Sequence, residues 1–321
     1  MSRPSLTLLL AAIQLACGSA MAATGAPVAD AIWFNGPIIT LDDKHPNAQA
    51  VAVKDGKIAA VGKVSGQGAE EIDAKGLLVT PGFVDIHTHY DGQATWDPFV
   101  TPSSWHGVTT VLMGNCGVTF APVVEQDREF LAEMMESVED IPRQSILEGL
   151  PWDWETYPEY LDSVQRLKPA LNVVGLVGHC AIRSQVMGDR SLSDEEPTPE
   201  ELGRMADIAE ESVAGGAVGF STSRILLHVV PDGRCVPGTY AKIDEYKAIA
   251  DGMNRAGGGI FQAVNDFATK AEYEFTLLRE MAQHAGDVLF SGGAGDGLSK
   301  LGVLRHEVAF HLFEQFLLAL R

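Results

Sequence analysis

The pattern of apolar and polar positions changes near residue 79. Before it, short apolar runs at residues 38–41, 50–53 and 57–61 alternate with turn residues. Asp55 and Gly56 separate the last two runs and form a two-residue hairpin signal. This pattern predicts a small domain of short strands over residues 23–78.

After residue 79, continuous apolar runs alternate with helical patterns. Six of these runs are predicted to be strands, at residues 79–89, 109–115, 172–179, 217–223, 259–264 and 287–291. Alternating strands and helices predict an α/β fold with a parallel sheet that closes as a (β/α)8 TIM-type barrel. Because such a barrel needs eight strands, the barrel over residues 79–321 is expected to be truncated. The sequence from about Gly293 onward does not resemble the further strands and helices that such a barrel would need.

Two of the connecting helices have clear sequence signals. Thr198 is a predicted N-cap, Pro199 suits the first helical position, and Glu201 completes a capping box. A second helix is predicted over residues 240–256, where a glycine run ends it. Both helices lie between predicted strands, as a parallel barrel requires.

The first predicted barrel strand carries two histidines. Residues 81–91 read PGFVDIHTHYD, and on a strand the side chains of Asp85, His87 and His89 would share one face. Imidazole nitrogen suits zinc and similar divalent ions, so the pair is a candidate metal site. The alternative is a pair of hydrogen-bonded core histidines.

A cysteine follows the second predicted strand. Residues 107–118 read as a buried strand that ends in Cys116 between glycines. A thiol at this edge of a barrel is a candidate metal ligand, whereas the alternative is a small buried hydrophobic residue. With Cys180 and Cys235, it makes an odd number of cysteines after residue 22, which leaves at least one without an intrachain partner.

The N-terminus predicts export. Arg3, an apolar stretch at residues 6–15 and the sequence Ala-Met-Ala at residues 20–22 are typical of a signal peptide cleaved before Ala23. The mature protein is then periplasmic or secreted. A lipid anchor on Cys17 is the alternative, and the stretch is too short to span a bilayer.

The acidic balance limits the partners. A formal net charge of −20 opposes binding to nucleic acid or to anionic lipid, so no such partner and no membrane contact apart from that possible anchor are expected. A small molecule is the expected partner.

Four motifs together resemble the amidohydrolase superfamily and, within it, the N-acyl-D-amino-acid deacylases. They are PGFVDIHTH, GNCG at residues 114–117, GHCAIR at residues 178–183 and GGAVGFST at residues 215–222. The resemblance covers residues 29–290. It implies a TIM-type barrel beside a small β-sandwich, of which residues 23–78 would form the N-terminal part.

The resemblance also implies a chemistry, with departures from the family pattern. It implies one or two divalent ions, Zn²⁺ first among them, on His87, His89 and Cys116, and substrate contacts from His179 and Arg183. The strand at residues 217–223 lacks the bridging lysine of many amidohydrolases, which favours a ligand cysteine. The strand at residues 259–264 lacks the family's histidine. The oxygen donors available to replace it are Gln262, Asn265 and Asp266.

The expected reaction is metal-dependent hydrolysis of a linear amide, with N-acyl-D-amino acids as substrates. Another amide or a cyclic imide is an alternative substrate. The resemblance places the general-base aspartate beyond residue 321, so no catalytic base is assigned. A catalytically inactive fragment is therefore the alternative from another class.

Overall fold

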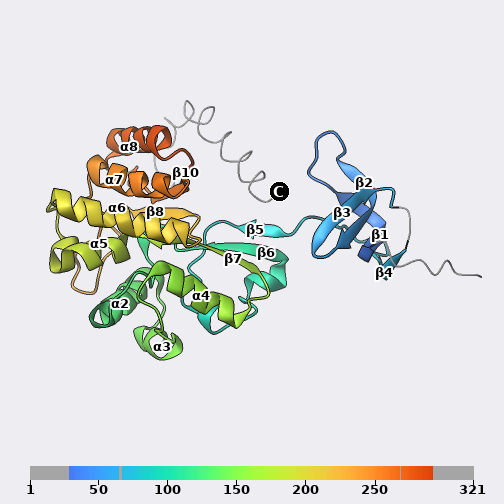
Figure 1. Cartoon of the computed structure of the whole chain (residues 1–321), viewed down its shortest axis with the longest axis horizontal. Helices are drawn as coiled ribbons and strands as arrows, with labels where there is room; N and C mark the ends of the chain where they lie inside the picture. The colour runs from blue at the N-terminus through green and yellow to red at the C-terminus, as the bar shows by residue number, and fades with distance from the viewer. Residues whose placement is uncertain (1–28, 65–66, 268, 292–321) are drawn as a thin grey trace, which may run out of the picture. The chain divides into compact units, whose positions relative to one another are not determined.

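The computed structural model describes residues 29–64, 67–267 and 269–291 (Figure 1). These residues form two compact units, which divide between Pro81 and Gly82. The predicted signal peptide at residues 1–22, including Cys17, and the tail from Gly293 lie outside the described residues. Each unit has its own sheet.

The first unit contains a four-stranded sheet. Its strands are β1 (Ala29–Ile39), β2 (Asn47–Lys54), β3 (Lys57–Gly62) and β4 (Gly68–Asp73), in the spatial order β3-β2-β1-β4. The hairpin predicted at Asp55 and Gly56 is confirmed, because Lys54 pairs with Lys57 in the antiparallel β2–β3 ladder. The sequence of β4, GAEEID, is too polar to have predicted a strand. The described residues of this unit form one sheet and do not establish the predicted sandwich.

The second unit is built on a curved sheet of six parallel strands. They are β5 (Phe83–Asp85), β6 (Val108–Met113), β7 (Asn172–Gly178), β8 (Gly219–Ser223), β9 (Ile260–Val264) and β10 (Val288–Ser291). Their spatial order, β10-β9-β8-β7-β6-β5, follows the sequence order, as in a parallel barrel. Five of the six predicted strands are confirmed over most of their length, whereas the first is much shorter, Phe83–Asp85, than the predicted residues 79–89. The observed sheet is a half-barrel.

Helices connect the strands. The α-helices are α2 (Arg128–Glu139), α3 (Arg143–Gly149), α4 (Tyr157–Leu167), α5 (His179–Met187), α6 (Pro199–Ala214), α7 (Ile243–Arg255) and α8 (Ala271–His284). Short 3-10 helices are η1 (Gln93–Thr95), η2 (Ser103–His106), η3 (Asn115–Gly117), η4 (Glu125–Asp127) and η5 (Gly188–Leu192).

The start of α6 is confirmed in detail. The Glu201 amide donates to Thr198 Oγ1 at 3.2 Å, and the Thr198 amide donates to the Glu201 carboxylate at 2.8 Å. This reciprocal pair satisfies two amides that the helix itself leaves unpaired. The helix predicted over residues 240–256 begins later, at Ile243, and ends at Arg255.

The interior strands are buried on both faces. Leu112, Met113, Phe220 and Phe261 are 0% exposed, which explains the continuous apolar runs in the sequence. Parallel strands end at the same edge of the sheet, so the residues that follow β5, β6, β8 and β9 are brought together. In the described part of the chain, no helix has both the length and the apolar character that crossing a membrane requires.

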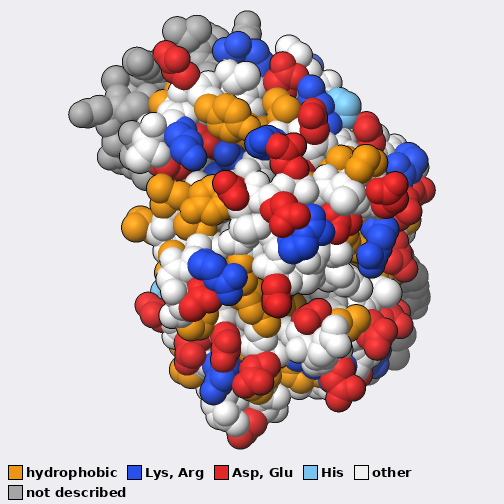
Figure 2. All heavy atoms as spheres, turned by 90° about the vertical axis from the view of Figure 1, so that its left-hand side faces the viewer, with side chains coloured by type: hydrophobic (Ala, Val, Ile, Leu, Met, Phe, Trp, Pro, Cys, Tyr) orange, Lys and Arg blue, Asp and Glu red, His pale blue; other side chains and the backbone are white. Residues whose placement is uncertain are grey.

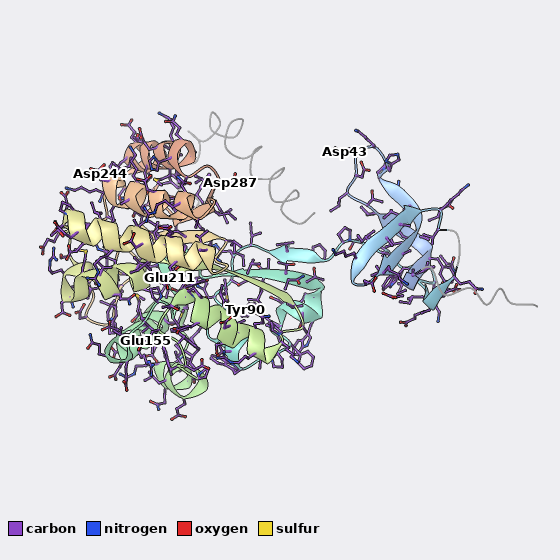
Figure 3. All side chains as sticks on the ribbon, viewed as in Figure 1. Asp43, Tyr90, Glu155, Glu211, Asp244 and Asp287 are labelled. Atoms are coloured by element: carbon purple, nitrogen blue, oxygen red, sulfur yellow. The ribbon has the colours of Figure 1, made fainter. Side chains whose placement is uncertain are left out.

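Charged residues are spread over the surface. On the face in Figure 2, acidic and basic side chains are interspersed. Glu155, Glu211 and Asp244, labelled in Figure 3, are exposed and come from three separate segments.

Candidate metal centre

The two histidines follow β5 instead of lying within it. The strand ends at Asp85, so the prediction that His87 and His89 are strand residues was wrong. The chain nevertheless stays beside β6, because the Thr88 amide and hydroxyl both donate to Leu112 O, at 3.1 and 2.8 Å. Since Thr88 points into the protein, the neighbouring histidines lie together, with ring centroids 5.5 Å apart.

The cysteine lies in a tight turn after β6. Gly114 has a φ of 78°, and a Cβ there would lie 2.1 Å from Leu176 O, so only glycine fits. Cys116 itself has a φ of 59°. A non-glycine residue in this left-handed region costs of order 1–3 kcal/mol and persists only where its surroundings hold it, which is often at a functional site.

Two neighbouring strands hold this turn. The Cys116 amide donates to Gln262 Oε1 of β9 at 3.1 Å, and the Gly117 amide donates to Ser221 Oγ of β8 at 3.0 Å. The Ser221 hydroxyl in turn donates to Gly114 O. The GNCG turn at residues 114–117 is therefore hydrogen-bonded to the GFSTS sequence of β8, and these bonds fix the position of the Cys116 thiol.

Three donor atoms converge at this edge of the sheet. The ligand atoms of His87, His89 and Cys116 all lie within 4.8 Å of one another. Cys116 Sγ is 3.3 Å from His87 Nε2 and 3.7 Å from His89 Nε2. Around a tetrahedral zinc ion, with bonds of roughly 2.3 Å to sulfur and 2.05 Å to nitrogen, these donors would be about 3.6 Å apart. The three donors therefore fit a zinc-like ion.

The histidines are in the protonation state that a metal needs. Burial, together with the charges of His87 and His228, lowers the pKa of His89 to about 4. Burial also lowers the pKa of His87, although Asp85 opposes this effect. Both rings are thus held neutral near pH 7, as a ligand imidazole must be.

In the absence of a metal ion, the Cys116 thiol resists deprotonation. Burial, followed by the negative charges of Glu139 and Asp91, raises the pKa of Cys116 to about 12. A thiolate at this position would need a cation beside it. The free thiol is therefore protonated near pH 7, and binding of a divalent ion would release its proton.

Sequence reasoning missed the carboxylates beside these donors. Glu139 Oε1 lies 3.2 Å from His89 Nε2, and burial and then the Asp140 charge raise the pKa of Glu139 to about 7. Asp91 is fully buried, accepts a hydrogen bond from the Gly114 amide at 3.0 Å, and has a pKa that burial raises to about 7. No motif links Glu139 to the histidines, so only the fold could reveal it.

A further histidine lies near the site. His228 follows β8, and its Nδ1 lies 2.8 Å from Ser223 Oγ. Burial, followed by the charge of His87, lowers the pKa of His228.

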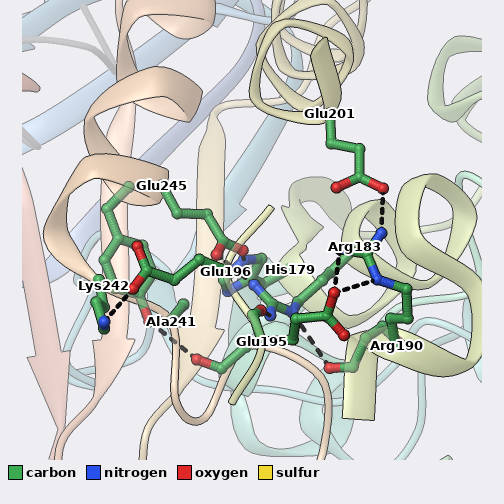
Figure 4. Close-up of polar contacts among 12 residues, drawn as sticks. His179, Arg183, Arg190, Glu195, Glu196, Glu201, Ala241, Lys242 and Glu245 are labelled. Carbon is green, nitrogen blue, oxygen red and sulfur yellow. Dashed lines mark hydrogen bonds and ion pairs between the residues drawn. The ribbon is translucent and has the colours of Figure 1, made fainter. Parts of the chain in front are cut away.

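His179 and Arg183 lie inside the protein (Figure 4). His179 is the first residue of α5 rather than the end of a strand, and its ring nitrogens contact Thr222 Oγ1 at 2.9 Å and Glu245 Oε1 at 2.7 Å. Arg183 is 1% exposed and is paired with the other oxygen of Glu245. A cavity of about 100 Å³ borders Arg183, together with Glu195, Lys242 and Glu245. Because Glu245 compensates the guanidinium charge, substrate binding by this pair stays a prediction.

The possible replacements for the missing histidine have other partners. Gln262 accepts from the Cys116 amide, and Asn265 donates to Glu274 at 2.6 Å. The Asp266 carboxylate accepts from the Thr269 amide at 3.2 Å. Of these three, Gln262 contacts a metal donor residue: its side-chain oxygen accepts from the backbone amide of Cys116 and not from the thiol.

A curved parallel sheet with metal donors at the carboxyl ends of its strands is the arrangement of TIM-barrel enzymes with a metal site. The sequence profile described as "Amidohydrolase family" matches residues 70–298, and this chain belongs to that family. The resemblance seen in the sequence is thereby confirmed.

Two of the proteins similar to this chain are deacylases by name. A D-aminoacylase of Alcaligenes xylosoxydans xylosoxydans is 33% identical over 194 residues, which are 60% of this chain and 37% of that protein. An N-acyl-D-aspartate deacylase of the same organism is 31% identical over 214 residues, 66% of this chain and 38% of that protein. A protein of Mycobacterium tuberculosis that has no assigned function is 34% identical over 251 residues, 74% of this chain and 39% of that protein.

Solved structures agree with these relatives. A D-aminoacylase structure with a binuclear metal centre has a TM-score of 0.65 at 27% identity and covers 88% of this chain and 56% of that chain. Another D-aminoacylase structure has a TM-score of 0.63 at 28% identity, and the match covers 81% of this chain and 51% of that chain. The chain thus spans about two fifths of the curated relatives and about half of these structures.

Proposed function

We propose that this metal site serves hydrolysis of a linear amide bond, with N-acyl-D-amino acids as the substrate class. The observation that carries the proposal is the convergence of His87, His89 and Cys116 in a member of the amidohydrolase family. Relatives that act on N-acyl-D-amino acids, by their names, support the substrate class.

Different residues of this chain would bind the ion and position its ligands. His87, His89 and Cys116 would hold the ion, and zinc is proposed because two imidazoles and a thiolate suit it. When bound, such an ion supplies Lewis acidity, which polarises an amide carbonyl and lowers the pKa of a water molecule. The β8 and β9 contacts through Ser221 and Gln262 would keep the thiol fixed while the substrate binds and leaves.

Paired substrates test the proposal. Amine release from N-acetyl-D- and N-acetyl-L-amino acids should show preference for the D form in protein loaded with zinc. The control is a Cys116→Ser variant, which should lose the activity, because a hydroxyl is a much poorer ligand than a thiolate. A preference for L substrates, or activity on cyclic imides alone, would contradict the substrate class.

The alternative is a metal-binding protein without activity. Its observable signature is a 321-residue chain that binds zinc at His87, His89 and Cys116 but releases no amine from either enantiomer. Reading the nucleotide sequence downstream of codon 321 and testing the extended protein would then separate an inactive site from a site that needs further residues.

A further inference from the structure

Helix α2 carries a carboxylate to the three donors. Glu139 is the last residue of this helix, and its Oε1 lies 3.2 Å from His89 Nε2. That nitrogen is the same atom that lies 3.7 Å from Cys116 Sγ. Because Leu131, Met134 and Met135 bury the helix in the core, Glu139 is presented by a packed element instead of a free loop.

The distance suits a shared cation. Oxygen and nitrogen donors that each lie about 2.0–2.2 Å from a tetrahedral zinc ion are about 3.4 Å apart. The observed 3.2 Å is close to this value. Glu139 is outside the group whose donors all lie within 4.8 Å of one another, so full coordination requires its side chain to rotate at the helix end.

The charge balance also favours a fourth donor of this kind. Two neutral imidazoles and one thiolate leave a divalent ion with a net charge of +1 in a partly buried site, and one carboxylate makes the site neutral. The side chains of His89 and Glu139 are only 16% and 21% exposed. A buried carboxylate is stabilised when it is paired with a cation or coordinates a metal.

We propose that Glu139 is an oxygen donor of the metal site, which gives the donor set His87, His89, Cys116 and Glu139. The proposal rests on the metal site proposed above and deepens it. It adds a protein ligand to a site in a chain whose fifth strand lacks the family's histidine. The ligand comes from the β6–β7 connection, on the opposite side of the sheet order from β9.

Matched variants of the 321-residue chain test this assignment. Zinc affinity is measured by competition with a chromophoric chelator, and the visible spectrum of the Co²⁺-loaded protein reports the donor set. Glu139→Gln should weaken zinc binding about 10- to 100-fold and shift the d–d bands of cobalt, since even outer partners of metal ligands have effects of this size. Asp140→Asn is the control: it removes a neighbouring negative charge at an exposed position whose left-handed backbone asparagine accepts, and it should change affinity by about twofold or less.

A conservative variant separates ligation from folding. Glu139→Asp keeps the carboxylate and should bind zinc more tightly than Glu139→Gln. Unchanged affinity and cobalt bands in Glu139→Gln would overturn the proposal, and so would equal losses in the Asp and Gln variants. Metal that survives a combined His87→Ala and His89→Ala substitution would instead refute the site itself, so the two failures are distinguishable.

Discussion

At the level of single residues, the site joins two histidines that resist protonation to a thiol that resists deprotonation. Burial causes both effects, because it disfavours the charged form of each group. Without a cation, the neutral forms of His89 and Cys116 are the stable ones. A divalent ion binds the neutral imidazole directly and stabilises the thiolate form of the cysteine, so it can be held by both groups at once.

Substitution of the donors tests this arrangement. His87→Ala, His89→Ala and Cys116→Ser should each abolish stoichiometric metal, because each removes one of three converging donors. Elemental analysis of folded, dialysed protein provides the measurement. His106→Ala is the control, since this exposed histidine in η2 should retain the metal of the unmodified protein.

A single hydroxyl holds the cysteine turn to β8. Ser221→Ala should lower the free energy of unfolding by about 1–3 kcal/mol, because the buried Gly117 amide would lose its acceptor. The same change should weaken metal binding, since the turn carries Cys116. Chemical denaturation and a zinc titration measure the two effects. Ser137→Ala, at an exposed position of α2, should leave both unchanged; an identical loss there would contradict the argument.

At the level of elements, Glu245 of α7 connects α5 to the core of the sheet. It contacts His179 and Arg183, and His179 also contacts Thr222 of β8. Burial raises the pKa of Glu245, but hydrogen bonding and charge from His179, together with the charge of Arg183, bring it below its ordinary value. Burial lowers the pKa of His179.

These shifts predict a pH dependence of stability. His179 has a folded-state pKa below 6.5, so below pH 6.5 the unfolded chain binds a proton that the folded chain does not. Stability therefore falls as pH decreases through this range, by up to about 1.4 kcal/mol per pH unit for one proton. Glu245 acts in the same direction below pH 4.5.

Unfolding curves between pH 5 and 8 measure this effect. His179→Gln should reduce the slope of stability against pH. His284→Gln should preserve it, because His284 is the last residue of α8 and its side chain is 32% exposed. A slope that is unchanged in His179→Gln would contradict this argument and assign the dependence to His87, His89 and His228, whose pKa values are also lowered.

The sequence predicted strands well and helices poorly, for a physical reason. Strands such as β7 and β9 are buried on both faces and therefore read as apolar runs. Eight of the nine residues of α5 are buried, so the helix has no polar face and gave no periodic signal. Glu139 was missed for a related reason, because its contact with His89 joins segments 50 positions apart and follows no local pattern.

At the level of the whole molecule, the amidohydrolase assignment concerns residues 70–298, and the segment before the first sheet carries a separate prediction. Export should remove residues 1–22. Mass spectrometry of protein from the native host should find Ala23 at the N-terminus, because Ala-Met-Ala precedes it as a cleavage sequence. A lipid-modified Cys17 would support the lipoprotein alternative, and an intact Met1 would contradict both.

The hydrogen bond between the Cys116 amide and Gln262 joins positions 146 residues apart. A ribosome that has just completed the GNCG sequence has therefore not yet made the strand that holds it, and the nascent thiol lacks its final geometry. Selective metal capture should then be a late event in biosynthesis, after β9 has docked. Zinc added to a refolding reaction should bind in step with the burial of β9 instead of preceding it.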